Sequence, residues 1–185
     1  MHTLKTSDFN YYLPENLIAQ TPVEPRDSSR LLVLDRGNGS IEHRRFTEIR
    51  DYLRPGDALV FNDSRVIPAR LYGHKMGTGA KVEALLLIRH SQNEWQALIK
   101  PAKRLGAGTI VELHDKSGGE SGVTFEVLNK NEDGIANIRF SDENRLSELG
   151  ILALPPYIHQ RLAEPERYQT VYSRINGSVA APTAG

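Results

Sequence analysis

The chain has 185 residues, and its 23 Lys and Arg side chains balance 23 Asp and Glu, so the formal net charge is zero. This balance excludes a basic surface over the whole protein, and 39% hydrophobic with 25% charged residues is typical of folded rather than disordered or fibrous proteins. No apolar run approaches the roughly 20 residues of a membrane-spanning helix, and the first residues lack a signal-peptide pattern. We therefore expect a cytoplasmic protein. The chain has no cysteine, which leaves carboxylates, six histidines, hydroxyls and arginines for chemistry.

The first 70 residues predict short elements of mixed type. A compact apolar strand is expected over 31–35, and the turn 37–39 has glycines that tolerate positive φ before a second strand begins at Ile41. This pattern predicts a β-hairpin. A short helix is expected over 48–53. The apolar run in 58–62 lacks alternation, which favours a strand covered on both faces, although a buried helical turn has the same pattern.

From about Leu71 the pattern changes to short strands separated by glycine-containing turns. The strands begin every 10 to 15 residues, a spacing typical of a small barrel or sandwich, so we expect a self-contained β unit. A helix over 142–149 is expected to follow and to end at Gly150 in the left-handed αL conformation. The return to the first domain is placed near residue 152. The expected strands cover residues 82–88, 95–100, 109–113, 123–128 and 135–140.

Two arginines flank a pair of hydroxyls in the loop ahead of the first strand. Arg26 and Arg30 are four residues apart with Ser28 and Ser29 between them, and they could hold a carboxylate or a phosphate through bidentate hydrogen bonds. The alternative is a solvated turn in which Asp27 pairs locally with an arginine.

Polar side chains also follow directly after the strand expected over 58–62. Residues 62–65 read Asn-Asp-Ser-Arg, and in open α/β sheets ligands gather outside the carboxyl ends of strands. Asp63 is therefore a candidate general base or acceptor for a ribose hydroxyl. The alternative is an Asx-turn that stabilises a tight bend.

Basic residues gather at the end of the strand expected over 95–100. Lys100, Lys103 and Arg104 could contact phosphates and contribute to nucleic-acid binding, although lysines and arginines on loops are more often simply solvated. No HExxH motif occurs and the histidines are scattered, so a metal site is not expected. Trp95 fits the core of the β unit better than a base-stacking role.

Several blocks of the sequence match a known family in order and spacing. They are residues 17–20, 26–34, 56–73, 81–87, 154–158 and 167–185; the most specific are NDSRVIPARL at 62–71, YQTVY at 168–172 and AAPTAG at 180–185. Over nearly its whole length the chain thus resembles the S-adenosylmethionine:tRNA ribosyltransferase-isomerases of queuosine biosynthesis. Members of that family continue beyond the last block, so the resemblance implies that this chain is truncated.

The resemblance implies an α+β, multidomain fold. A small β-barrel would be inserted in an α/β barrel-like domain that is incomplete in this chain. Residues 1–70 would form the first part of the α/β domain and residues 71–151 the inserted β-barrel. Residues 152–185 would return to the α/β domain, which is truncated there. The change of pattern near Leu71 and Leu152 agrees with these boundaries.

The resemblance also implies a reaction. The ribosyl moiety of S-adenosylmethionine would be transferred and isomerised onto 7-aminomethyl-7-deazaguanine at the wobble position of tRNA, which gives epoxyqueuosine and releases adenine and methionine. S-adenosylmethionine would be a co-substrate, with no permanently bound cofactor and no metal, because the sulfonium is a built-in leaving group. The expected partners are S-adenosylmethionine and this tRNA, with no membrane.

The expected site combines a base with fixed cationic donors. Asp63 is the expected catalytic base, because the sulfonium acidifies the adjacent 5′ C–H group, and Arg65 is expected to stabilise anionic species. These residues and the stretch around Tyr168 are expected to line one hollow. The expected substrate-binding residues are Arg26, Ser29, Arg30, Asn62, Arg70, Tyr168, Gln169, Thr170, Pro182 and Thr183, and the expected tRNA-binding residues are Lys100, Lys103 and Arg104.

Two alternatives remain at the level of sequence. The first is a nonenzymatic RNA-binding β-barrel module with the rest of the chain as scaffold, since small barrels bind oligonucleotides. The second is a small-molecule transferase unrelated to RNA, in which Arg26 and Arg30 hold a phosphate.

Overall fold

The computed structural model describes residues 3–160 and 162–183, which belong to two compact units. One unit comprises residues 1–60 and 155–163, and the other comprises residues 61–154 and 164–185. Within the described ranges no helix is long and apolar enough to cross a membrane. The strands are β1 (Arg30–Leu34), β2 (Ile41–Arg45), β3 (Ser64–Val66), β4 (Arg70–Lys75), β5 (Lys81–Ser91), β6 (Glu94–Lys100), β7 (Ile110–His114), β8 (Glu120–Lys130), β9 (Ile135–Phe140) and β10 (Ile175–Ser178). The helices are α1 (Leu146–Leu149) and the 3₁₀ helices η1 (Thr6–Phe9), η2 (Glu15–Leu17), η3 (Arg26–Ser28), η4 (Phe46–Tyr52), η5 (Ala102–Arg104), η6 (Glu143–Arg145) and η7 (Pro165–Tyr168).

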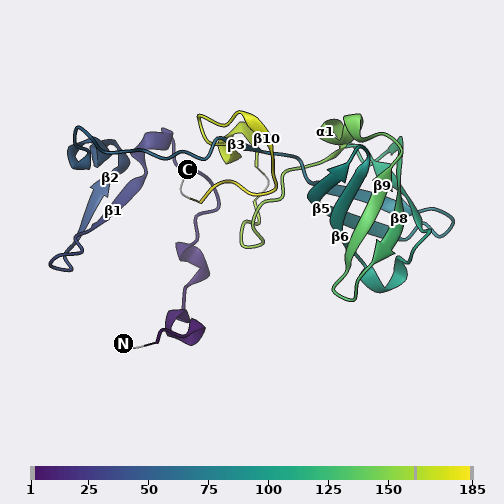
Figure 1. The fold of residues 1–185 in the computed structure, drawn as a ribbon, viewed down its shortest axis with the longest axis horizontal. Helices are drawn as coiled ribbons and strands as arrows, with labels where there is room; N and C mark the ends of the chain where they lie inside the picture. Colours follow the sequence, from purple (N-terminus) through teal and green to yellow (C-terminus); the bar gives the residue numbers. More distant parts are fainter. Residues whose placement is uncertain (1–2, 161, 184–185) are drawn as a thin grey trace. The chain divides into compact units, whose positions relative to one another are not determined.

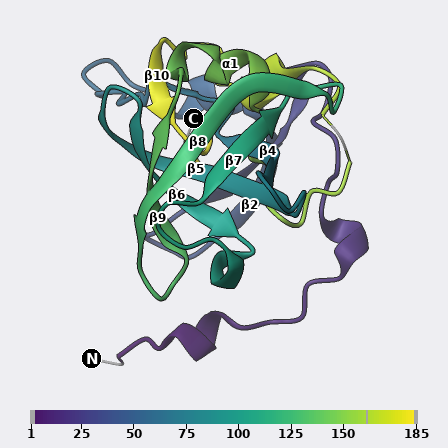
Figure 2. The same ribbon diagram turned by 90° about the vertical axis from the view of Figure 1, so that its right-hand side faces the viewer.

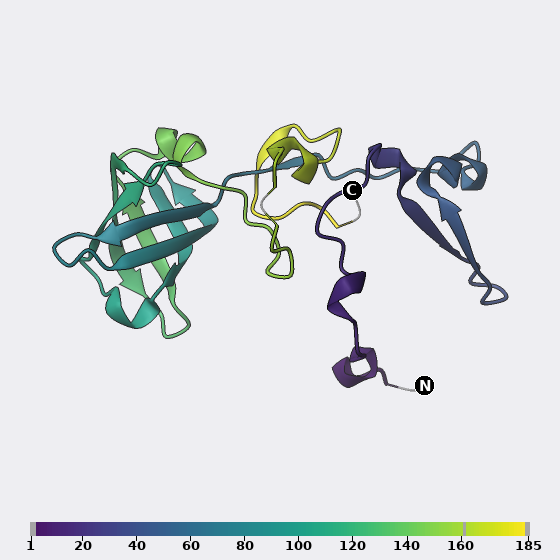
Figure 3. The ribbon, with the colours of Figure 1, turned by 180° about the vertical axis from the view of Figure 1, so that it is seen from behind.

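The first unit contains the antiparallel hairpin β1–β2, which Figure 3 shows from behind. Leu34 pairs with Ile41 at the turn end of the hairpin. The Asp35 carboxylate accepts a hydrogen bond of 2.7 Å from the backbone N–H of Gly37, which starts the turn. Gly39 has φ +72°, a left-handed conformation that glycine adopts without steric cost. The predicted hairpin is confirmed.

The first unit exposes its apolar side chains. None of its described residues is fully buried, and Leu32, Leu34 and Ile41 of the hairpin are all exposed. The helix predicted over 48–53 is the 3₁₀ helix η4, whose first turn is held by the Glu48 carboxylate accepting a hydrogen bond of 2.7 Å from the Arg45 N–H.

The strand predicted over 58–62 is wrong. The segment has no regular structure, and Val60 is 96% exposed. A strand covered on both faces needs a neighbouring strand and packing layers, and none of the described strands pairs with this segment. The apolar residues of this segment predicted that it is buried, but no described strand or packing layer covers it.

The second unit contains a closed barrel of strands in the order β4-β5-β6-β9-β8-β7, and every neighbouring pair is antiparallel. Figure 2 shows β7 and β8 crossing the near side of this barrel. Along β8 the side chains of Val123, Phe125 and Val127 are buried while their neighbours are not, as the period of two requires. All five strands predicted in this region are confirmed, and the β-barrel implied by the resemblance is confirmed with them.

The sequence pattern missed β4, the strand that closes the barrel. Its inward positions are Leu71 and Gly73, both buried, and a glycine gives no apolar signal. Gly73 is needed for close approach, because a Cβ there would lie 2.2 Å from the backbone oxygen of Glu112 on β7. Gly73 therefore explains both why the sequence pattern of β4 is weak and how β4 can lie so close to β7.

The helix α1 covers one end of the barrel (Figure 1) and adds Leu146 and Leu149 to its core. The helix predicted over 142–149 is thus η6 followed by α1. Gly150 has an extended conformation with φ −75°, so the predicted αL stop is wrong. Glycine is required there for space, since a Cβ would lie 1.9 Å from the backbone oxygen of Pro68.

A largely buried carboxylate ties η6 to the barrel wall. Glu143 Oε2 accepts hydrogen bonds from Trp95 Nε1 at 2.9 Å and from Arg89 Nε at 3.0 Å. The hydrogen bond from Arg89 contributes most to lowering the pKa of Glu143 from its ordinary value of 4.5 to about 2, although burial opposes that shift. The single Trp of the chain is partly buried and packs against the core from the barrel wall, so it is not one of the fully buried core residues that its assignment predicted.

Replacing Gly73 by Ala is expected to destabilise the barrel by about 1–3 kcal/mol, because the new methyl group forces β4 away from β7. Urea unfolding followed by Trp95 fluorescence measures this loss. Gly106→Ala is the matched control, since a Cβ there meets nothing within 4 Å. Equal midpoints for the two variants would contradict the steric explanation.

Candidate functional site

Two segments about a hundred residues apart lie side by side in the second unit. β3 and β10 form a parallel pair, in which Ser64 lies opposite Ile175 and Arg65 opposite Asn176. Past the end of β3, the Ile67 N–H donates a hydrogen bond of 2.8 Å to the Ser178 carbonyl. Figures 1 and 3 show the two strands adjacent from opposite sides. The blocks at 62–71 and 167–185 therefore meet in space.

The side chain of Gln169 fastens this junction. Its Oε1 accepts a hydrogen bond of 2.9 Å from the Val66 N–H, and its Nε2 donates one of 2.9 Å to the Val66 carbonyl. Gln169 is only 6% exposed. A buried amide that satisfies both backbone groups of one residue takes the place of a missing strand neighbour. Gln169 was expected to bind substrate; the described contact is structural, and substrate contact stays a prediction.

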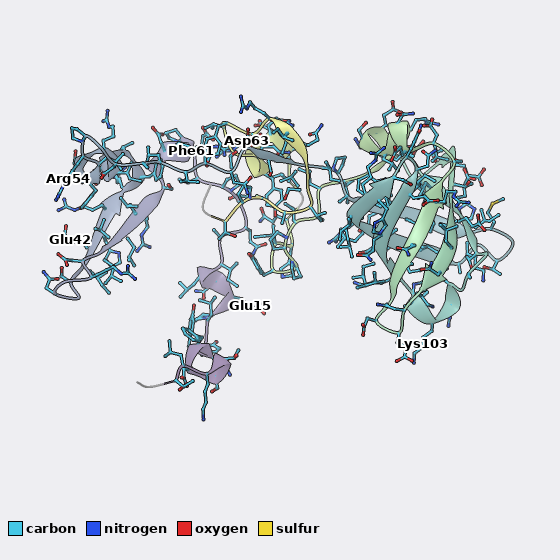
Figure 4. The ribbon with its side chains drawn as sticks, in the orientation of Figure 1. Glu15, Glu42, Arg54, Phe61, Asp63 and Lys103 are labelled. Carbon is cyan, nitrogen blue, oxygen red and sulfur yellow. The ribbon has the colours of Figure 1, made fainter. Side chains whose placement is uncertain are left out.

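Asp63 precedes β3 (Figure 4) and is paired with Arg174. Its Oδ2 accepts hydrogen bonds from Arg174 Nη2 at 2.8 Å and Nε at 3.1 Å. No described side chain donates to Oδ1, so that oxygen is available to accept a proton from a ligand. The Asx-turn considered for Asp63 is formed by its neighbour, since the Asn62 Oδ1 accepts a hydrogen bond of 2.9 Å from the Ser64 N–H.

Arg65 is bound on the other side of the same junction. It forms an ion pair with Glu166 and donates a hydrogen bond of 3.2 Å from Nη1 to the Ser173 hydroxyl. The junction thus holds two carboxylates and two guanidiniums in alternating pairs. A partly open carboxylate with fixed cations in the same junction suits a reaction in which a proton is removed and charge develops nearby.

Aromatic and hydroxyl groups complete the junction. The rings of Phe61 and Tyr172 contact edge to face, with centroids 4.9 Å apart. The hydroxyl of Thr170, buried beside Gln169, has no hydrogen-bond partner among the described residues. Tyr168 ends η7 and is half-buried. An unpartnered buried hydroxyl is a donor and acceptor that a ligand can satisfy.

The sequence missed three residues of this junction. Glu166, Ser173 and Arg174 hold Arg65 and Asp63, and each lies next to the stretch 167–172 that drew notice as a motif. Their position near that motif was the only feature of the sequence that pointed to these three residues. Their roles could not be predicted, because the sequence does not show which segment lies against β3.

The remaining predicted substrate-binding residues lie elsewhere. Arg70 begins β4, with its Nε 3.9 Å from the Glu83 carboxylate and without a hydrogen-bond partner in the described part of the chain. Pro182 and Thr183 follow β10.

The arginine loop belongs to the first unit. Arg26 lies in η3, Ser29 accepts a backbone hydrogen bond of 2.8 Å from Phe46, and Arg30 begins β1. Convergence of Arg26, Ser29 and Arg30 with Asp63 stays a prediction, because the two units are described separately.

The predicted tRNA-binding residues lie on one loop of the barrel. Lys100 ends β6, and Lys103 and Arg104 belong to η5; all three are exposed, and Figure 4 shows Lys103 projecting from the barrel. The ammonium of Lys130 donates hydrogen bonds to the Ala102 carbonyl and, at 3.0 Å, to the Leu105 carbonyl. This loop therefore presents its cations from a fixed backbone. Over 3–160 and 162–183, no group of three or more potential metal ligands gathers.

Known proteins match this chain over almost its whole length. The family model described as "Queuosine biosynthesis protein" matches residues 6–185. An S-adenosylmethionine:tRNA ribosyltransferase-isomerase of Dehalococcoides mccartyi (strain CBDB1) is 60% identical over 182 residues, and one of Clostridioides difficile (strain 630) is 53% identical over 186 residues. Each alignment covers 98% of this chain and 53% of the relative. A crystal structure of S-adenosylmethionine tRNA ribosyltransferase from Thermotoga maritima, 43% identical, matches 77% of this chain and 48% of its own with a TM-score of 0.38.

The chain belongs to the queuosine biosynthesis protein family, as the blocks at 62–71 and 168–172 predicted. The relatives carry the name of an enzyme, so the nonenzymatic alternative is not favoured. The chain spans about half the length of the curated relatives it matches.

Replacing Gln169 by Leu is expected to loosen β3 from β10. The buried N–H and carbonyl of Val66 would lose their partners, which costs about 2–3 kcal/mol, or roughly a hundredfold in the amide hydrogen-exchange rate of Val66 and Ile67. Exchange followed by mass spectrometry or NMR measures it. Thr170→Val is the control, because it removes a neighbouring buried hydroxyl that has no described partner. Unchanged protection in the Leu variant would remove Gln169 from this role.

Proposed function

We propose that this chain contributes the β3–β10 junction to an S-adenosylmethionine:tRNA ribosyltransferase-isomerase. The reaction transfers and isomerises the ribosyl moiety of S-adenosylmethionine onto 7-aminomethyl-7-deazaguanine at the tRNA wobble position, and it releases adenine and methionine. The observation that supports this most is the junction itself, where Asp63 with its open oxygen is paired with Arg174 and the same strand pair holds the guanidinium of Arg65. The names of the relatives supply the substrate class.

The chemistry begins with proton removal. The positive sulfur of S-adenosylmethionine acidifies the adjacent 5′ C–H group, and Asp63 Oδ1 accepts that proton. Arg174 holds the other carboxylate oxygen and so orients Oδ1. Arg65 stabilises the negative charge that develops as the sugar ring opens, because its guanidinium is already fixed by Glu166 and Ser173. The sulfonium leaves as neutral methionine, so the scheme needs no permanently bound cofactor and no metal. Because the proposed substrate is a tRNA, the proposed place of action is the cytoplasm.

The first unit belongs, in this proposal, to an α/β barrel-like domain into which the barrel of 71–151 is inserted. The support is its surface: Leu32, Leu34 and Ile41 are exposed, as is the run around Val60. Large apolar side chains exposed in such number are typical of a surface that another part of a protein covers. In proteins of the relatives' length, the further polypeptide would cover it.

The role of Asp63 is tested in a chimera that joins this chain to the part of the Dehalococcoides relative it does not cover. Asp63→Asn is expected to lower single-turnover, tRNA-dependent adenine release by a factor on the order of 10² to 10⁴, the usual contribution of a positioned base. Asp133→Asn, in an exposed turn of the barrel, is the matched control and should leave the rate unchanged.

A second variant separates catalysis from folding. Arg174→Gln removes the partner of Asp63 but keeps the carboxylate, so the rate should stay within about tenfold of the unmodified chimera if Asp63 is the base. Equal losses for Arg174→Gln and Asp63→Asn would show that only the ion pair matters. Full activity of Asp63→Asn would exclude it as the base.

The exposed cations of the η5 loop are proposed to contact the tRNA backbone, since a chain with zero net charge must bind phosphates through local patches. Neutralising Lys103 and Arg104 together should reduce the slope of log affinity against log salt by about 1.5, because each phosphate contact contributes roughly 0.7–0.9. Titration of labelled tRNA over a salt series measures the slope. Lys116→Ala, an exposed lysine on another barrel loop, controls for net charge. A slope unchanged by the double variant would exclude this loop.

A further inference from the structure

A hollow of about 430 Å³ opens on the barrel wall, away from the β3–β10 junction. Its volume falls within the range of roughly 300–1,000 Å³ that small-molecule sites occupy. Four strands supply its lining: β5 gives His90, β6 gives Glu94 and Trp95, β8 gives Leu128 and Asn129, and β9 gives Asn137 and Arg139. Figure 2 shows these strands in the barrel wall. Every lining residue belongs to the closed barrel, so the hollow is formed by rigid elements.

Irregular pairing explains why side chains gather there. The register of β8 against β9 shifts between Val127 and Asn129, which places Asn129 opposite Asn137. On β5 the pairing with β6 shifts between Arg89 and Ser91, next to His90. Such bulges change the direction of side chains and occur at functional sites.

The two asparagines leave a matched donor and acceptor unused. Asn137 Nδ2 donates a hydrogen bond of 3.0 Å to Asn129 Oδ1, which fixes both amides. Among the described residues, the Asn129 amide group and the Asn137 carbonyl oxygen have no other side-chain partner. A neighbouring N–H donor and carbonyl acceptor are the groups with which asparagine reads the edge of a base.

A flat cation lies beside the two amides. The Glu94 carboxylate accepts hydrogen bonds from Arg139 Nη2 at 2.7 Å and from Nε at 3.0 Å, and this pairing holds the pKa of Glu94 below its ordinary value. The Arg139 side chain still remains 53% exposed. A guanidinium plane fixed in this way can stack on a base, and so can the exposed His90 ring.

The charge of the hollow selects the kind of ligand. Arg139 is neutralised by Glu94, so the lining does not concentrate positive charge as a phosphate site would. Leu128 adds apolar surface. An uncharged flat heterocycle with polar edges fits this lining better than a phosphate or an acidic peptide.

We propose that this hollow binds an unpaired nucleobase of RNA, with the base stacked on Arg139 or His90 and its edge bonded to Asn129 and Asn137. Single-stranded RNA is read in this way, by stacking and by hydrogen bonds to splayed-out base edges. That the RNA is the tRNA substrate rests on the proposed function; the base-binding hollow itself does not.

The test compares two chemically identical substitutions in the 185-residue chain. Asn129→Asp keeps the oxygen that accepts from Asn137 but replaces the free N–H donor by a charged oxygen. Asn131→Asp adds the same charge two residues away, outside the hollow, and keeps the oxygen that accepts from the Ile135 N–H. Asn129→Asp should weaken binding of a labelled short single-stranded RNA by about tenfold and Asn131→Asp by less than about twofold. Equal effects, or no binding by the unmodified chain at micromolar concentration, would overturn the proposal.

A second RNA distinguishes this proposal from the proposed function. If the hollow binds bases but the protein does not act on tRNA, Asn129→Asp lowers the affinity for an anticodon stem-loop and for an unrelated single-stranded RNA by the same factor. If the protein acts on tRNA but not through the hollow, the unmodified chain binds the stem-loop more tightly than the unrelated single strand, and both variants bind the stem-loop with equal affinity. NMR provides a direct reading, because the Asn129 side-chain amide signals should shift with RNA. A shift of the same size with inorganic phosphate alone would refute base binding.

Discussion

The hydrogen bonds between the Gln169 side chain and the Val66 backbone hold together the part of the molecule that carries its candidate chemistry. They join segments 103 residues apart in sequence. Asp63 and Arg65 lie just before Val66, and their partners Glu166, Ser173 and Arg174 lie on either side of Gln169. Without this bracket the two segments would be joined by the short β3–β10 backbone pairing and by ion pairs, and ion pairs at a partly exposed site contribute little free energy.

The barrel lowers the entropy cost of bringing these distant segments together. Its first and last residues meet, since Arg70 and Ile151 exchange backbone hydrogen bonds of 3.0 and 2.9 Å. The chain therefore leaves the barrel close to where it entered, and the effective loop between β3 and β10 is much shorter than its length in sequence. A glutamine bracket also occurs in the first unit, where Gln20 donates to the Tyr157 carbonyl at 2.9 Å and accepts from the His159 N–H at 2.7 Å. In both places, one amide side chain helps to join a segment that follows the barrel in sequence to one that precedes it.

The sequence predicted those parts of the structure that depend on local patterns. Alternation in Val123, Phe125 and Val127 predicted a strand with one buried face, and the same rule held for the other predicted barrel strands. The run around Val60 failed because apolar composition signals burial without naming a partner. The predicted α/β domain differs from what the first unit contains, since its described helices are all short 3₁₀ turns and none of its described residues is buried. Asp63 and Arg65 stood out by their place after an apolar run, whereas the identity of their partners depended on a tertiary contact that no spacing encodes.

Zero net charge shapes how such a protein can handle a nucleic acid. A uniformly basic surface would bind any RNA through its phosphates, and affinity of that kind carries no sequence information. Here the exposed cations Lys103 and Arg104 stand on a fixed loop, while Arg139 is neutralised by Glu94 beside two amides. The first arrangement suits phosphates and the second suits bases. A barrel that separates the two tasks can keep its electrostatic attraction modest and let hydrogen bonds to base edges decide which RNA remains bound.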